Sequence, residues 1–221
     1  MKNDHLDIGR MKAELLEALK PHVPFDGWSE PAFRQAVSDL AVDPGVARLV
    51  CPRGALDLAV EYHRAADRAA AAGIADADWA GLKFREKVAA AVRLRLELVD
   101  PELVRRAAAL MALPQHAATG AKLVWESADM IWTALGDSSR DYNWYSKRLT
   151  LSGVISGTVL YWMGDESEGR AASWEFLDRR IAEVMQIEKI KGRVTGLPGL
   201  KSLLGCLQAP EPRPAPGRTT P

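Results

Sequence analysis

Four histidines and one serine are the side chains that could do catalytic or metal-binding chemistry in this sequence. His5, His22, His63 and His116 would suggest a metal site if two of them, or one and a glutamate, stood three or four residues apart on a helix. None does. Ser156 lies in GVISG, but a nucleophile elbow needs its serine centred between glycines on a strand-to-helix turn. The glycine-rich motifs for nucleotides and phosphates are also missing, so we predict no catalytic residue, no metal, no cofactor and no enzyme.

A second group of distinctive residues lies in GDSSRDYNWYSKRLTLSG at positions 136–153. Trp144 and Tyr145 stand there beside Lys147 and Arg148, directly before a run without charge, LTLSGVISGTVLYWM at 149–163. This run is shorter than the ~20 residues that a helix needs to cross a bilayer. We therefore expect a buried helix with an aromatic, basic start.

Small residues recur within the uncharged run. They either allow a neighbouring helix to approach closely or leave room for a ligand beside large apolar groups. The uncharged run is therefore compatible with two interpretations, a packed central helix or one wall of a lipid-sized cavity. In the second case the lipid-binding residues are Leu149, Gly153, Val154, Ser156, Gly157, Leu160 and Tyr161.

Helical periodicity dominates the chain, and we find no strand with alternating polarity. Three short helices come first, and in the second of them Ser29 is placed to cap a first turn that contains Pro31. A fourth helix is expected to stop at Gly73, and a long one to run from Asp78 to Val99. Four more helices follow, so we predict an all-α fold of about nine helices.

The chain divides into an N-terminal helix-turn-helix-like subdomain at 1–75 and a main helical domain at 76–192. Residues 193–208 are expected to form a hinge and a short amphipathic helix, and the proline-rich residues 209–221 a disordered tail. The apolar stripe of the short helix would either contact a membrane or pack back on the body. Its membrane-contact residues would be Leu200, Leu203, Leu204 and Leu207.

The charge balance limits the class of partner. Lys and Arg number 29, and Asp and Glu also number 29, so the chain lacks the overall positive field of a general nucleic-acid binder. Cys51 and Cys206 lie far apart without metal-ligand spacing, as expected of a reduced intracellular protein. No targeting segment is visible at the N-terminus, and we expect a cytoplasmic protein.

The three short helices resemble the DNA-reading end of TetR-type regulators, in which the segment DPGVARLV at 43–50 would enter the major groove. Residues 21–60 carry three arginines against five carboxylates, a net charge of −2. Because lysine and arginine contacts to phosphates supply much of the affinity for DNA, we expect no nucleic-acid partner. A TetR-type transcriptional regulator with a hydrophobic-ligand pocket is kept as the alternative function.

Three segments, RLRLELVDPELVRRAAALMALPQH, DYNWYSKRLTLSGV and DESEGRAASWEFLDRRI, resemble the Coq-nine family of ubiquinone-biosynthesis accessory proteins over roughly residues 80–188. The N-terminal helices are similar to those of its bacterial members, which share the TetR-like architecture without acting as regulators. With no transit peptide in view, we expect a bacterial, alphaproteobacterial-like member. The most specific matches are Gly136, Asp137, Asp141, Trp144, Tyr145, Arg148, Trp174, Phe176, Leu177 and Arg180.

The resemblance implies a non-catalytic protein that binds a polyprenyl quinone precursor, or another isoprenoid or a phospholipid. It further implies peripheral contact with the inner membrane, a homodimer, and presentation of the lipid to the di-iron demethoxyubiquinone hydroxylase of the Coq-seven type. Asp137, Asp141 and Arg148 have an alternative role, in which they cap the helix and pair across its first turns. The partner-binding residues that the resemblance implies are Leu96, Ile131, Asp141, Trp144, Tyr145 and Arg148.

Overall fold

The computed structural model describes residues 7–194, and among these the side chains of residues 7–184. This range folds into helices and contains no strand. Nine of its α-helices are longer than the single turn of α2, in agreement with the predicted all-α fold. The elements are α1 (Ile8–Leu19), η1 (Lys20–His22), α2 (Val23–Asp26), α3 (Glu30–Asp39), α4 (Pro44–Val50), α5 (Ala55–Asp76), α6 (Phe84–Glu97), α7 (Pro101–Met111), α8 (Ala117–Ala134), α9 (Tyr142–Trp162), η2 (Glu168–Arg170) and α10 (Ala171–Val194).

The short helices α3 and α4 each begin with a polar side chain that accepts a hydrogen bond from a backbone N–H of the first turn. The Ser29 hydroxyl accepts a hydrogen bond from the backbone N–H of Ala32 at 3.4 Å, which confirms the predicted start of α3. The Asp43 carboxylate caps α4 in the same way, through the N–H of Val46 at 3.0 Å. Each helix carries a proline in its first turn, where the missing N–H costs no helical hydrogen bond.

The N-terminal helices enclose the first of two apolar clusters, which lies around the start of α5. The Trp28 indole N–H donates to the backbone carbonyl of Leu103 at 3.1 Å and so ties this end of the molecule to α7. The largest buried apolar side chains of the cluster are Leu15, Leu16, Leu19, Val23, Trp28, Phe33, Val37, Val50, Leu58 and Leu103.

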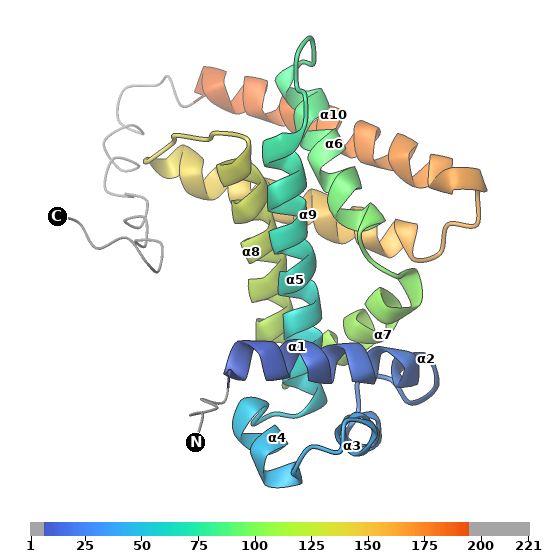
Figure 1. Cartoon of the computed structure of the whole chain (residues 1–221). Helices are drawn as coiled ribbons and strands as arrows, with labels where there is room; N and C mark the ends of the chain where they lie inside the picture. The colour runs from blue at the N-terminus through green and yellow to red at the C-terminus, as the bar shows by residue number, and fades with distance from the viewer. Residues whose placement is uncertain (1–6, 195–221) are drawn as a thin grey trace, which may run out of the picture.

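Helix α5 connects the two ends of the molecule. Figure 1 shows it upright in the centre, with α1, α3 and α4 at its lower end and α10 across its upper end. We expected this helix to stop at Gly73, which is wrong, because it continues to Asp76. A Cβ on Gly73 would lie 3.3 Å from the Leu94 side chain, so this glycine lets α6 approach closely. The division at residue 75 falls in the last turn of α5 and stays a prediction.

The helix expected from Asp78 begins only at Phe84. The Asp78 carboxylate accepts from the N–H of Ala80, two residues ahead, and the Trp79 indole donates back to the carbonyl of Ile74. These bonds fold residues 77–83 into a loop. Helix α6 starts instead where the backbone N–H of Lys83 donates to Glu86 at 2.9 Å.

The second apolar cluster joins the upper part of α5 to α6, α8, α9 and α10. The two clusters meet at Tyr62, which packs against both. The predicted membrane-contact residues Leu200, Leu203, Leu204 and Leu207 and the predicted tail at 209–221 lie outside the described residues. The largest buried side chains of the second cluster are Ile74, Val88, Val92, Leu96, Val99, Ile131, Leu151, Val154, Ile155, Trp162, Leu177 and Ile181.

Candidate ligand-binding site

An apolar cavity of about 340 Å³ lies where α5, α6, α7, α8 and α9 meet. Its volume is within the range of small-molecule sites, roughly 300–1,000 Å³. The apolar and small residues of its wall are Ala59, Leu96, Val104, Ala107, Ala108, Met111, Ala112, Ala117, Gly120, Ala121, Leu123, Val124, Ile155, Ser156, Val159, Leu160 and Met163.

Small side chains keep this cavity open. Alanines from α5, α7 and α8 line it, together with Gly120. Because alanine ends at its Cβ and glycine has none, these helices can pack at ordinary distances and still leave space between them. The remaining wall is aliphatic, so the cavity suits an apolar ligand.

Polar side chains interrupt the apolar wall on one side. The His63 Nε2 lies 2.8 Å from the Ser127 hydroxyl and 3.2 Å from the carbonyl of Leu123. The Ser127 hydroxyl lies 2.9 and 3.0 Å from the two carboxylate oxygens of Asp67. The Arg95 Nε donates to the same carboxylate at 2.9 Å. His63, Arg95 and Ser127 all line the cavity, with Asp67 behind them.

The proton positions in this network follow from its acceptors. A carboxylate and a carbonyl accept only, so Ser127 donates to Asp67, and His63 Nε2 carries the proton that points to Ser127 and Leu123. Burial, and then the charge of Arg95, lower the pKa of His63 to about 4. The imidazole is therefore neutral at pH 7, with an unprotonated Nδ1.

The predicted lipid-binding residues are divided between several places. Ser156 and Leu160 line the cavity. Val154 is buried in the second apolar cluster. Leu149 and Tyr161 are exposed and do not line the cavity. Gly153 and Gly157 also lie outside its lining: a Cβ on Gly153 would meet nothing within 4 Å, and a Cβ on Gly157 would lie 3.8 Å from the Phe176 ring. The lipid-binding role of this set stays a prediction, but five of its seven members do not line the cavity.

Most of the wall comes from helices that the sequence did not single out. The alanine-rich segment RRAAALMAL on α7 carries a usable signal, since its Ala107, Ala108 and Ala112 all line the cavity. His63 and Asp67 stand four residues apart on α5, a second signal. Their partners Ser127 and Arg95 come from α8 and α6, and only the fold brings them together.

The aromatic, basic start of α9 is held by a buried ion pair. Arg148 is 2% exposed, and its Nη1 lies 3.0 Å from Asp137 Oδ2. Its Nε also pairs with Asp129, and its guanidinium carbon lies 4.0 Å from the centre of the Trp144 ring. Lys147 binds the second oxygen of Asp137 at 2.7 Å. These contacts connect the loop before α9 to the first turns of the helix. Pairing of this kind is the alternative role considered above for Asp137 and Arg148.

The remaining partner-binding candidates of this segment lie near the surface. The exposed Asp141 caps α9 through the backbone N–H of Asn143 at 3.0 Å. Trp144 and Tyr145 are half-buried, with their rings nearly perpendicular and 4.8 Å apart, and the Trp144 ring also packs on Trp125 of α8. A partner-binding role for these three residues stays a prediction.

Two other partner-binding candidates lie in the core. The side chains of Leu96 and Ile131 are 2% and 1% exposed and belong to the second apolar cluster. The implied placement of both residues on a partner surface is therefore corrected, because a partner cannot reach a side chain that other core residues cover. Leu96 also lines the cavity.

Residues 7–194 offer no group of three His, Cys, Asp or Glu side chains that could hold a metal ion. None of the helices in the same range is long and apolar enough to cross a membrane.

Comparison with known proteins relates the cavity-forming helices to one family. The COQ9 family model matches residues 117–188, which form α8, α9 and most of α10. The ubiquinone biosynthesis protein COQ9 of Drosophila melanogaster is 30% identical over 196 residues, which are 86% of this chain and 60% of that protein. The chain is therefore similar to COQ9 proteins over most of its length. The COQ9 protein of Rattus norvegicus is 25% identical over 218 residues, 93% of this chain and 69% of that protein.

The chain spans less than two thirds of the Drosophila and Dictyostelium COQ9 proteins, at 60% and 64% of their lengths. The crystal structure of the TetR transcriptional regulator from Nitrosomonas europaea superposes with a TM-score of 0.64, covering 80% of this chain and 99% of that chain at 17% identity. This match confirms the predicted TetR-like fold.

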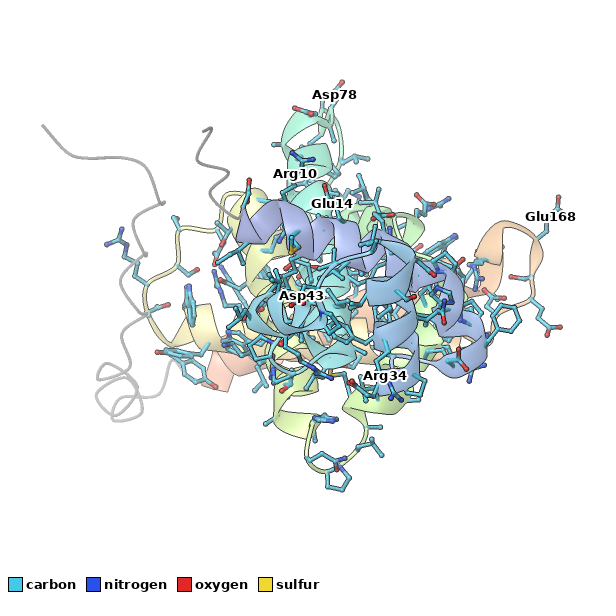
Figure 2. All side chains as sticks on the ribbon, turned by 60° about the horizontal axis from the view of Figure 1, so that its bottom comes forward. Arg10, Glu14, Arg34, Asp43, Asp78 and Glu168 are labelled. Atoms are coloured by element: carbon cyan, nitrogen blue, oxygen red, sulfur yellow. The ribbon has the colours of Figure 1, made fainter. Side chains whose placement is uncertain are left out.

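The face that would meet DNA in a TetR-type regulator carries little free positive charge in this chain. Arg48 of α4 pairs with Glu30 and lies over the Phe33 ring, and Arg53 pairs with Asp57. Figure 2 looks onto this end, with Arg34 and Asp43 on the side toward the viewer. Carboxylates therefore pair with two of the three arginines at 21–60, a range whose net charge is −2.

Proposed function

We propose that this chain is a COQ9-family protein, a non-catalytic accessory protein of ubiquinone biosynthesis that binds a polyprenyl quinone precursor, or another isoprenoid or phospholipid, in its cavity. The single observation that carries the proposal is the apolar cavity between α5 and α9 in a chain that is similar to COQ9 proteins. Aliphatic walls release ordered water when an isoprenoid tail enters, which stabilises the complex by about 25 cal/mol for each Å² of apolar surface covered.

The proposal includes presentation of the lipid to the di-iron demethoxyubiquinone hydroxylase. The half-buried pair Trp144 and Tyr145 supports a docking surface at the start of α9, because aromatic side chains on a rigid element often carry much of the binding energy of an interface. A homodimer and peripheral membrane contact through Leu200, Leu203, Leu204 and Leu207 belong to the same proposal and rest on the family resemblance.

The alternative of a TetR-type regulator uses the same cavity and differs at the N-terminal end. Affinity for DNA depends on several free lysines or arginines facing phosphates. Arg48 and Arg53 are paired with carboxylates here. The accessory role is therefore the better supported of the two.

Filling the cavity tests the lipid-binding role. Phenylalanine at Ala108 of α7 places a large side chain in the space that a prenyl tail would occupy. We expect Ala108→Phe to lower the amount of lipid that remains bound through purification at least tenfold, as measured by native mass spectrometry and lipid extraction.

The matched control is Ala109→Phe, which adds the same side chain at the next position of α7, where the residue is exposed and does not line the cavity. This variant should retain the lipid. Equal retention of lipid by Ala108→Phe and the parent, or a parent that holds no lipid after expression in a ubiquinone-producing host, would contradict the proposal.

Truncating Trp144 tests the docking surface. We expect Trp144→Ala to weaken binding to the purified hydroxylase at least tenfold by calorimetry, since central aromatic residues of interfaces typically contribute about 2 kcal/mol or more. Loss of its contact with Arg148 should cost about 1 kcal/mol of folding stability. Phe25→Ala, at an aromatic side chain 85% exposed on α2, is the control and should bind like the parent. Unchanged affinity in Trp144→Ala would place the docking surface elsewhere.

A further inference from the structure

The polar side of the cavity wall has a role that an apolar tail does not explain. His63, Ser127, Arg95 and Asp67 form a connected network, in which Ser127 is 1% exposed and both Arg95 and Asp67 are 7% exposed. Buried polar groups cost free energy unless they are hydrogen-bonded. A cavity that only held a hydrocarbon would be more stable with aliphatic residues at these positions.

One atom of this network lacks a partner among the residues that the structure describes. The Nε2–H of His63 is shared between Ser127 and Leu123, whereas Nδ1 has no hydrogen bond within residues 7–184. Because Nε2 carries the proton, Nδ1 is an acceptor. His63 lines the cavity, so a ligand that carries an O–H group could donate to this nitrogen.

The network is balanced in charge. The Arg95 guanidinium is paired with Asp67 at 2.9 Å and also donates to the carbonyl of His63. The nearby Arg64 is paired with Glu126 through two hydrogen bonds of 3.0 Å. Since both cations are already neutralised, an anionic head group would enter the cavity without a counterion, which is costly.

We propose that His63, oriented by Ser127 and Asp67, forms a head-group subsite that selects a lipid with an uncharged hydroxyl, such as a phenol, through a hydrogen bond to Nδ1. This inference rests on the proposed lipid-binding function and names the chemistry of the head group. The apolar wall of α7, α8 and α9 holds the tail, while Ser127 and Asp67 fix the tautomer that leaves Nδ1 free to accept.

Three probes with the same tail test the subsite: 4-decylphenol, 4-decylanisole and decyl phosphate, each titrated into the delipidated full chain. We expect the parent to bind the phenol at least tenfold more tightly than the anisole, which lacks the O–H donor, and to bind the phosphate most weakly. His63→Leu removes the Nδ1 acceptor without adding another acceptor, and the Ser127 hydroxyl can still donate to Asp67. It should bind phenol and anisole equally, with the affinity for the anisole unchanged.

His22→Leu is the matched control, because His22 is a histidine outside the cavity, with its Nε2 2.7 Å from Asp39 Oδ2. It should retain the preference for the phenol. Equal binding of phenol and anisole by the parent, an unchanged preference in the His63 variant, or tightest binding of the phosphate would overturn the subsite while leaving lipid binding in place. No binding of any probe by the parent would overturn the proposed function, and this inference with it.

Discussion

Replacing Arg148 with methionine is expected to lower the free energy of unfolding by about 3 kcal/mol. Breaking a buried ion pair from one side typically costs about 3–5 kcal/mol, because the remaining charge is left in a medium that solvates it poorly. The carboxylate left behind is Asp137, whose side chain is 3% exposed. We expect the low end of the range because Lys147 still binds Asp137 at 2.7 Å. Urea denaturation followed by circular dichroism measures the change.

Two further variants isolate the ion pair as the cause. Arg180→Met removes an arginine that is 45% exposed and paired with Glu183, and exposed pairs contribute less than about 1 kcal/mol. Adding Asp137→Asn to Arg148→Met removes the uncompensated charge and should restore part of the lost stability. A loss below about 1 kcal/mol in Arg148→Met would mean that the buried ion pair has no large structural role.

The sequence predicted helices where local signals determine them. Ser29 and Pro31 locate the start of α3 because capping acts within one turn. The start of α6 was missed since no Ser, Thr, Asp or Asn directly precedes Phe84. Asp78 has the residue type of a cap, but its carboxylate bonds only two residues ahead, and the following backbone turns at Gly81 with a φ of +77°.

The cavity was predicted less well than the helix that was expected to form it. The run 149–162 of α9 has no charged residue and therefore no charged face that shows which side points to solvent, so its orientation cannot be determined from the sequence of the run. Gly153 and Gly157 do not line the cavity, whereas Ile155, Ser156, Val159 and Leu160 do. The rest of the wall comes from four other helices, and only packing brings them together.

The buried ion pair illustrates the same limit. Asp137 and Arg148 are eleven residues apart and separated by the loop before α9, so helical spacing does not relate them. Leu96 and Ile131 were assigned to a surface through a family comparison, which gives no information about burial in this chain. Their positions in the core follow from the packing of α6 and α8 against α5 and α9.

Acidification is expected to destabilise the protein in several steps, of which the one at the highest pH belongs to His63. The pKa of His63 is about 4 in the folded chain, compared with the ordinary value of 6.5 that applies to the unfolded chain. Between these pH values the unfolded chain binds a proton that the folded chain excludes, because burial and Arg95 outweigh the attraction of Asp67 and Glu126. Stability is therefore complete above pH 6.5 and falls by about 3 kcal/mol as the pH approaches 4.

A step at lower pH belongs to Asp137, whose pKa is lowered to about 2 because hydrogen bonds from Lys147, Ser139 and Arg148 outweigh the opposing effect of burial. Its contribution is complete above pH 3.8 and is lost as the pH falls through 2. Urea denaturation at intervals from pH 7.5 to 2 should resolve both steps. His63→Gln should flatten the dependence between pH 6.5 and 4 alone, and Asp137→Asn the dependence below pH 4 alone. If His63→Gln keeps the full slope of the parent between pH 6.5 and 4, His63 titrates normally in the folded chain, and the lowering of its pKa at the cavity wall is ruled out.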